Sequence, residues 1–416
     1  MQKCSNSTVK IKAAVNAFIE GKKLTLSSKK CHRIHVENKR SKLQPNCKPL
    51  KVHEHKINES KQEKYLGDLV NSSGTIRQTI EERKNKGYGI VSEILAILDE
   101  IPLGRYKLEI GLKLRQAMLI NGILFNSEAW HSVSESELRL LEVVDEHLLR
   151  SLVKGQAKTP LEFIYLETGA IPIRFIISSR RLIFHQTILQ REDKELTKRI
   201  YKAQKNDQTT GDFVKLLSED FKLINRTQED RRIQMTNRKA YKQQIKKDIK
   251  EAAFNYLTEK QKEHSKVKDI QYVSLSTQKY LLSPVFTNEE VRLLYALRSR
   301  GTECKSNFKQ KYAHTNLLCF LCKAQNEDQQ HILSCKVIQK EFKTDELSNG
   351  IIKYENIFSK EISKQKTVTS LFNKLFKIRN TLIEKMNSQE APSNADVVLE
   401  MSDPLHPCIL NLPSGK

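Results

Sequence analysis

Three cysteines and one histidine in the C-terminal part of the sequence have the types and the spacing of a metal site. Cys319, Cys322, His331 and Cys335 follow the pattern C-x2-C-x8-H-x3-C. Thiolate and imidazole groups are preferred ligands of Zn²⁺, usually four of them in a tetrahedron. A C-x2-C pair puts two sulfurs on one tight turn, and an H-x3-C pair puts two more ligands on one face of a short helix. The pattern predicts a structural Zn²⁺ site of the CCHC zinc-knuckle kind; the alternative is four unrelated buried or solvated side chains.

The other cysteines form no comparable set. They are scattered along the sequence as Cys4, Cys31, Cys47, Cys304 and Cys408. Eight cysteines in 416 residues do not make a disulfide scaffold. The N-terminal residues lack the apolar core of a secretory signal, and no apolar run approaches the length of a membrane helix. We therefore expect an intracellular protein, cytoplasmic or nuclear, with reduced thiols and no membrane contact.

The sequence is strongly basic, with 72 Lys and Arg against 49 Asp and Glu and a net charge of +23. Such an excess favours polyanionic partners, of which nucleic acid is the commonest. Residues 1–64 hold 16 basic and 5 acidic side chains, and residues 226–268 hold 13 and 6. The alternative is a set of solvated helix faces or a disordered basic tail. In the second segment the candidate nucleic-acid contacts are Arg238, Lys239, Lys242, Lys246 and Lys247.

The pattern of apolar residues predicts a mainly α protein, because glycine and proline are sparse and helical spacing recurs. Helices are expected over residues 76–98, 106–125 and 173–191, with Gly87 and Gly89 interrupting the first. Ser134 and Glu137 form a capping box that opens a further helix, and Pro160 starts another at its first turn. Residues 65–225 therefore predict a bundle of about five helices.

The segments on either side of this bundle have different patterns. Residues 24–36 and 50–57 alternate apolar and polar side chains, which predicts two strands, and two strands alone are marginally stable. Residues 226–268 predict a long basic helix or helix pair, and Thr287 with Glu290 forms a second capping box. An amphipathic helix is expected over residues 364–386.

Several blocks of the sequence carry a resemblance to one family. They are KYLGDLVNSSGTIRQTIEERKNKGYGI, LRQAMLINGILFNSEAWHSV, ELRLLEVVDEHLLRSL and TPLEFIYLETGAIPIRFIISSRR. Together they resemble the region that follows the polymerase palm in reverse transcriptases of non-LTR (LINE-type) retrotransposons, which are transposable elements. The resemblance is strongest to the Dong-like branch. It continues through CFLCKAQNEDQQHILSC and KYENIFSKEISKQKTVTSLFNKLFKIRNTL, and it covers residues 13–385.

The resemblance and the residue patterns together imply six segments: a palm-end and primer-grip remnant (1–64), a helical thumb-like domain (65–225), a basic helical linker (226–300), the CCHC zinc knuckle (301–345), a C-terminal helical segment (346–386) and a tail (387–416). The Ser- and Pro-rich composition of the tail predicts disorder. The fold would be a thumb-like helical bundle with a small N-terminal β remnant. Lys30, or equally Lys29, would match a palm lysine that donates a proton to pyrophosphate in this family. Both lysines are candidate nucleic-acid contacts.

The sequence departs from the family where the chemistry of an RNA-directed DNA polymerase would lie. Two-metal nucleotidyl transfer needs paired carboxylates, which this family supplies from a palm aspartate and an aromatic-Ala-Asp-Asp turn. The sequence contains no Asp-Asp pair, and it offers no room for fingers and palm before residue 13. We therefore predict no catalytic residue, and Mg²⁺ only if a missing palm were present.

The function predicted on this basis is a truncated, nucleic-acid-binding remnant of a reverse transcriptase. It would bind RNA, RNA–DNA duplex or DNA through the thumb, the basic helix and the zinc knuckle. Further candidate contacts lie on one thumb helix and at the rim of the knuckle: Arg174, Arg180, Arg181, Lys323 and Lys336. For the three arginines, the alternative is surface solvation. Two other readings are a zinc-stabilised helical scaffold for protein contacts and a fragment of a longer, active reverse transcriptase.

Overall fold

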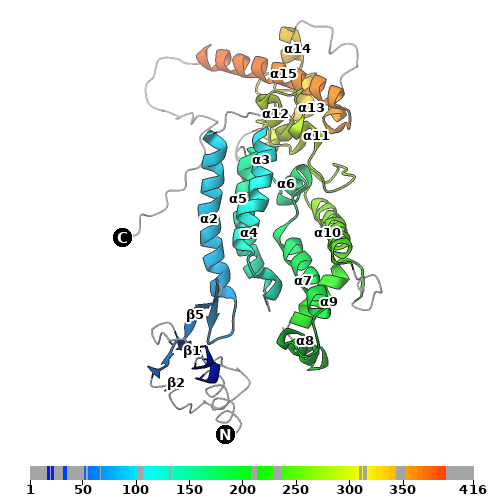
Figure 1. Cartoon of the computed structure of the whole chain (residues 1–416). Coiled ribbons are helices and arrows are strands. Elements are labelled where there is room, and N and C mark those ends of the chain that lie inside the picture. The colour runs from blue at the N-terminus through cyan, green and yellow to red at the C-terminus, as the bar shows by residue number, and fades with distance from the viewer. Residues whose placement is uncertain are drawn as a thin grey trace. The chain divides into compact units, whose positions relative to one another are not determined.

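The computed structural model is mainly α-helical, as the sequence predicts (Figure 1). The chain divides into two compact units, one made of Met1–Glu303 with Ile352–Ser370 and the other of Cys304–Ile351 with Leu371–Lys416. Lys29, Lys30 and most of the predicted C-terminal tail lie outside the described residues. The structure describes residues 16–18, 20–22, 31–34, 51–52, 55–65, 67–100, 106–130, 133–207, 213–227, 237–308, 312, 316–342 and 353–389.

The described N-terminal strands are short and form pairs. The parallel pair joins β1 (His32–Arg33) to β4 (Asn58–Glu59). Two antiparallel pairs join β2 (Lys51–Val52) to β3 (His55–Lys56) and β5 (Gln62–Tyr65) to β6 (Asp68–Asn71). Residues 50–57 were expected to form one strand, but their described part forms the hairpin of β2 and β3. Short two-stranded pairs bury little apolar surface, so they contribute little stability of their own.

The first layer of the larger unit contains α2 (Arg77–Glu100), α5 (Glu135–Val153) and a continuous helical run that begins with α3 (Tyr106–Leu114) and ends with the short α4 (Asn121–Ile123). These three lie side by side (Figure 1). Gly87 and Gly89 do not interrupt α2. A Cβ on Gly87 would lie 2.8 Å from Cγ1 of Val144, so this glycine lets α2 and α5 approach closely. The capping box of Ser134 and Glu137 is confirmed at the start of α5.

The helix expected over residues 106–125 contains a π-helical stretch, η2 (Arg115–Ile120), between α3 and α4. Within this stretch the buried Arg115 side chain donates to both carboxylate oxygens of Asp145, at 2.5 and 2.7 Å, and to the backbone oxygen of Ile171 at 2.9 Å. Tyr165 donates its hydroxyl to the same aspartate at 2.8 Å. A buried charge needs such partners, and this set joins η2 to α5, to α6 (Leu161–Thr168) and to the segment just before α7 (Ile173–Leu189).

A second layer follows in the same unit, built from helices that continue along the chain. Within residues 226–268, where one long basic helix or a helix pair was expected, the described helix is α10 (Arg238–Gln261), and residues 228–236 lie outside the described part. The buried residues of α10 pack on α6 and α7. Thr287 and Glu290 form the predicted capping box of α12. The elements of this layer are α6 (Leu161–Thr168), α7 (Ile173–Leu189), α8 (Leu196–Asp207), α9 (Phe213–Leu223), α10 (Arg238–Gln261), α11 (Lys279–Leu282), α12 (Asn288–Arg298) and the 3-10 helix η6 (Tyr354–Phe358).

The smaller unit contains the predicted metal ligands. Its elements are the 3-10 helix η5 (Lys305–Phe308), α13 (Gln329–Ser334), α14 (Lys336–Phe342) and the part of α15 (Ile362–Gln389) from Leu371 onward. The residues of α15 are therefore shared between the two units. Among the helices that the structure describes, none has the length and apolar character needed to cross a bilayer.

Candidate metal centre

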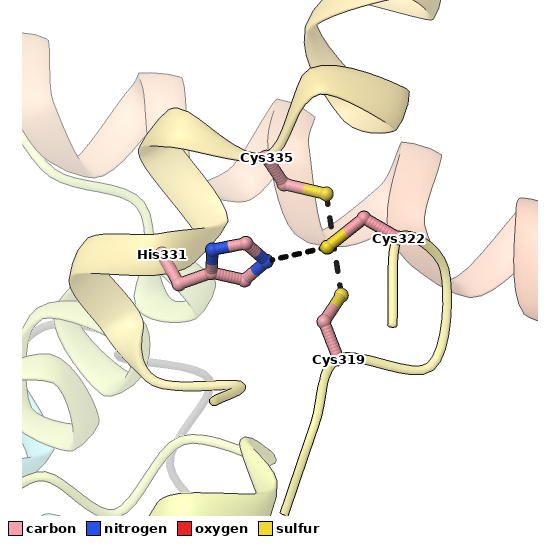
Figure 2. A group of neighbouring side chains, drawn as sticks. All are labelled: Cys319, Cys322, His331 and Cys335. Carbon is pink, nitrogen blue, oxygen red and sulfur yellow. Dashed lines mark hydrogen bonds between the residues drawn. The ribbon is translucent and has the colours of Figure 1, made fainter. Parts of the chain in front are cut away.

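The four predicted ligands converge on one point of the smaller unit (Figure 2). Their ligand atoms all lie within 4.8 Å of one another, with 4.0 Å between the sulfurs of Cys319 and Cys335 and 3.3 Å between Sγ of Cys322 and Nε2 of His331. A tetrahedron with Zn–S bonds of about 2.3 Å separates its sulfurs by about 3.8 Å. The observed separations therefore match what one metal ion bound by all four residues requires.

The first two cysteines lie in a tight turn that backbone hydrogen bonds close. Leu318 and Asn326 form a β-bridge at the base of the turn, and the N–H of Cys319 donates to the backbone oxygen of Gln325 at 2.8 Å. The N–H of Lys323 donates back to the oxygen of Cys319 at 3.0 Å. Lys323 has φ of 52°, a left-handed conformation that turns the chain sharply after Cys322. The two sulfurs thus face the same side.

Both the backbone and the side chain of His331 are held by neighbouring residues. Asp328 caps α13, and its Oδ1 accepts from the backbone N–H of His331 at 2.7 Å. Nε2 of the imidazole faces the sulfur of Cys322, while Nδ1 lies 3.1 Å from Oε1 of Gln325. A histidine that binds metal through Nε2 keeps its proton on Nδ1, which it can donate to Gln325. The orientation of the ring is therefore the one that a metal ligand needs.

Cys335 lies one residue beyond the end of α13 and not within the helix as expected. The H-x3-C spacing predicted that both residues share a helix face, but α13 ends at Ser334 and Cys335 is its C-cap, with φ of −64° and ψ of 113°. The extended backbone at this residue separates α13 from α14. Cys335 and Cys319 are buried, as are His331 and Ile332 of α13, so the site is largely shielded from water.

The protonation of the thiols depends on burial and on backbone N–H groups. Burial raises the pKa of Cys319 to about 12, although backbone N–H groups of Cys322 and Leu321 face its sulfur. Burial acts in the same direction at Cys322, but the N–H groups of Ala324 and Gln325 outweigh it and lower the pKa of that thiol. Thiol ligands must lose their protons, so binding of a metal ion at this site would release protons.

The four residues fit a metal ion, because three thiols and one imidazole form a complete tetrahedral set. They could hold a metal ion such as zinc. No family model, curated protein or solved structure matches the chain.

Two charged residues that the spacing did not reveal support the turn of the C-x2-C pair. Glu327 is buried, and its carboxylate accepts from the backbone N–H of Phe320 and from Arg379 of α15. A signal for the burial of Arg379 is present in the sequence, but it does not identify Glu327 as the partner. Arg379 continues the apolar stripe that includes Val368, Leu371 and Leu375, where a charge can be buried only with a partner.

The candidate nucleic-acid contacts on α7 are engaged with other protein groups. Arg174 donates to Glu142 at 2.7 Å, and this hydrogen bond raises the pKa of Arg174. Arg180 is half-buried and donates to the backbone oxygen of Leu124, and burial lowers its pKa. The guanidinium groups of both residues thus already have partners at the protein surface.

Arg181 is buried rather than exposed. It forms an ion pair with Asp220 of α9 at 2.9 Å, and burial raises the pKa of Asp220 to about 6 despite this partner. The guanidinium group of Arg181 lies inside the larger unit, between α7 and α9. Lys323 and Lys336 are exposed, and each directly follows a cysteine of the metal centre.

The basic residues of α10 lie on its solvent face. Its buried positions recur every fourth residue, from Tyr241 to Gln261, and the side chains between them are exposed or half-buried. Basic side chains fill the exposed positions in the first half of the helix: Arg238, Lys239, Lys242, Lys246, Lys247 and Lys250. Within the described part of the chain, no salt bridge joins these six side chains to a carboxylate.

Proposed function

We propose that this chain binds nucleic acid, and that a structural Zn²⁺ ion stabilises its C-terminal unit. The observation that carries the proposal is the exposed basic face of the first half of α10. Clustered lysine and arginine on one helix face is the electrostatic footprint of a polyanion site. The resemblance to the region after the palm of LINE-type reverse transcriptases supports the same class of ligand: RNA, RNA–DNA duplex or DNA. The proposal assigns no catalytic step.

The carboxylates of α10 do not neutralise the positive charge of this face. Asp248 is the only carboxylate between Arg238 and Lys250, and it is held by Arg226 at 2.7 Å. The first turn of α10 contains no acidic residue, although the positive end of the helix dipole favours one there. Two basic residues in that turn are unfavourable for the free helix. Bound phosphates would relieve this repulsion.

The spacing of the basic residues suits contact with a phosphodiester backbone. Arg238, Lys242, Lys246 and Lys250 are four residues apart, so they form a row along α10 with steps of about 6 Å. Phosphate contacts position a protein on nucleic acid without reading bases. We therefore propose binding that depends strongly on salt and weakly on sequence.

Zinc is the proposed metal because soft thiolates dominate the ligand set and the set is closed. A structural site uses four protein ligands, whereas a catalytic site leaves a position for water. The role of the ion in this proposal is to hold the C-x2-C turn, α13 and α14 together. The exposed Lys323 and Lys336 would then extend the binding surface of the smaller unit.

The test is binding of a labelled RNA–DNA primer–template to the full chain across a salt series. Lys242→Ala with Lys246→Ala removes two charges from the row. Lys260→Ala with Lys262→Ala removes two charges near the other end of α10, where Glu263 and Glu259 already pair them. The first variant is expected to weaken binding and to lower the salt slope by about 1 per contact, whereas the second leaves both nearly unchanged.

Equal effects of the two double variants would contradict a specific role for the row. A shallow salt slope in the wild-type chain would contradict the nucleic-acid proposal itself. Repeating the series with a zinc chelator tests whether the smaller unit contributes, since the proposal expects a further loss of affinity when the metal is removed.

A further inference from the structure

A buried ion pair lies beside the metal centre without touching its ligand atoms. Nη2 of Arg379 donates to Oε1 of Glu327 at 2.5 Å, and the two side chains are 6% and 0% exposed. Burying both charges costs desolvation free energy, and an apolar pair of similar volume often stabilises a fold equally well. Stability alone therefore does not account for a charged pair at this position.

The second carboxylate oxygen of Glu327 holds the turn of the first two ligands. Oε2 accepts from the backbone N–H of Phe320 at 3.1 Å, and Phe320 lies between Cys319 and Cys322. The backbone of Glu327 is held as well, because its N–H donates to the oxygen of Leu317 at 2.9 Å. A carboxylate supplies acceptors in two directions at once, which an apolar side chain cannot do.

The same turn is held by Lys305 of η5. Its ammonium group donates to the backbone oxygens of Leu318 and Asn316, at 2.8 and 3.3 Å. It also lies 3.7 Å from the centre of the Phe320 ring, a cation–π contact, and the guanidinium carbon of Arg379 lies 5.9 Å from the same ring. Phe320 is thus held through its N–H and through its ring by charged groups from outside the turn.

We propose that Glu327 and Arg379 are positioning residues of the metal centre. They fix the turn that presents the sulfurs of Cys319 and Cys322, so the affinity of the site for metal depends on α15. The inference rests on the proposed metal centre, but it assigns a role to two residues that bind no metal. Groups that orient metal ligands typically change metal affinity 10- to 100-fold when they are removed.

The experiment is a Co²⁺ titration of the full, metal-stripped chain against a competing chelator, because Co²⁺ reports its ligands in its absorption spectrum. Glu327→Gln keeps the volume of the side chain and removes its charge. Glu327→Leu with Arg379→Met removes both charges, so that neither is left buried alone. Lys374→Met is the matched control, since Lys374 is exposed on the same stretch of α15.

The expected result is a 10- to 100-fold weaker Co²⁺ affinity in the single and double variants, with the control equal to the wild type. The thiolate-to-cobalt band should shift in both variants. At saturating Co²⁺ their far-ultraviolet circular dichroism should equal that of the wild type, which separates positioning from misfolding.

Wild-type affinity and an unshifted band in the double variant would overturn the inference and leave the metal centre in place. Helical content that stays low at saturating metal would also overturn it, since the pair would then support the fold alone. A wild-type chain that binds no Co²⁺ would overturn both the metal centre and the inference.

Discussion

Glu167 and Arg298 form a fully buried ion pair, with Oε1 of the glutamate 2.8 Å from Nη2 and 3.1 Å from Nε of the arginine. Tyr272 donates to Oε1 at 2.6 Å, and Tyr280 donates to Oε2 at 2.7 Å. The remaining nitrogen of the arginine, Nη1, donates to the backbone oxygen of Ile357 at 3.0 Å. The carboxylate of Glu167 on α6 thus accepts from three later parts of the larger unit, and Arg298 links it to a fourth, η6.

Replacing Glu167 with glutamine is expected to destabilise the larger unit by about 3–5 kcal/mol, because Arg298 is left buried without a counter-charge. The measurement is the urea midpoint followed by circular dichroism. Arg298→Ala should cause a similar loss, whereas Arg292→Ala, at an exposed position of the same helix, should change the midpoint little. Equal midpoints for Arg298→Ala and Arg292→Ala would contradict the role assigned to the pair.

The two glycines of α2 should respond oppositely to alanine. A Cβ on Gly87 would lie 2.8 Å from Val144, so Gly87→Ala is expected to overpack the interface with α5 and to cost about 1–3 kcal/mol. No heavy atom lies within 4 Å of a Cβ on Gly89, so Gly89→Ala should stabilise the helix by about 0.5–1 kcal/mol. Thermal unfolding midpoints that move in the same direction for both variants would refute this packing.

Acid should destabilise the larger unit through His185 of α7. Burial, together with the charges of Lys205 and Lys198, lowers the pKa of His185 from 6.5 to about 4. Between pH 4 and 6.5 the unfolded chain binds a proton at His185 and the folded chain does not. The contribution of neutral His185 to the free energy of unfolding is therefore complete above pH 6.5 and is lost as the pH falls toward 4. At about 1.4 kcal/mol per pKa unit the loss amounts to about 3 kcal/mol.

His185→Gln lacks this titration, so its stability relative to the wild type should improve steadily as the pH falls from 7 to 4. The measurement is the difference between the urea midpoints of the two proteins across that range. A difference that stays constant with pH would show that His185 does not titrate in this way.

Removal of metal should unfold the smaller unit before the larger one. We expect one Zn²⁺ per chain by atomic absorption, and rapid hydrogen exchange of the backbone amides of residues 316–342 after chelation. Cys335→Ser should weaken Zn²⁺ binding strongly. Cys304→Ser replaces a buried thiol outside the ligand set and should leave the stoichiometry at one. Equal zinc contents in the two variants would contradict the assigned ligands.

Local patterns predicted much of the fold and the four ligands of the candidate metal centre. Helical spacing gave α2, α5 and α7 within a few residues, because their periodicity is set by neighbours three and four positions away. The pattern C-x2-C-x8-H-x3-C likewise joins residues within a single short segment. In both cases the information lies close together in the sequence.

The partners of buried charges could not be predicted in the same way. Arg181 looked like a phosphate contact because a charge in a helix gives no sign of which element covers it, and its partner Asp220 lies 39 residues away. Glu327 and Arg379 are separated by 52 residues. Such pairs depend on how the helices pack, and that packing is determined by many residues together and not by a local pattern.

The distance in sequence between Glu167 and Arg298, 131 residues, has a consequence for synthesis of the chain. A ribosome adds about 5–20 residues per second, so Arg298 is made roughly 7–26 s after Glu167. During that interval the carboxylate on α6 lacks the guanidinium that neutralises it in the folded unit. The nascent chain must therefore keep this part of α6 hydrated, and its final burial awaits the arrival of α12.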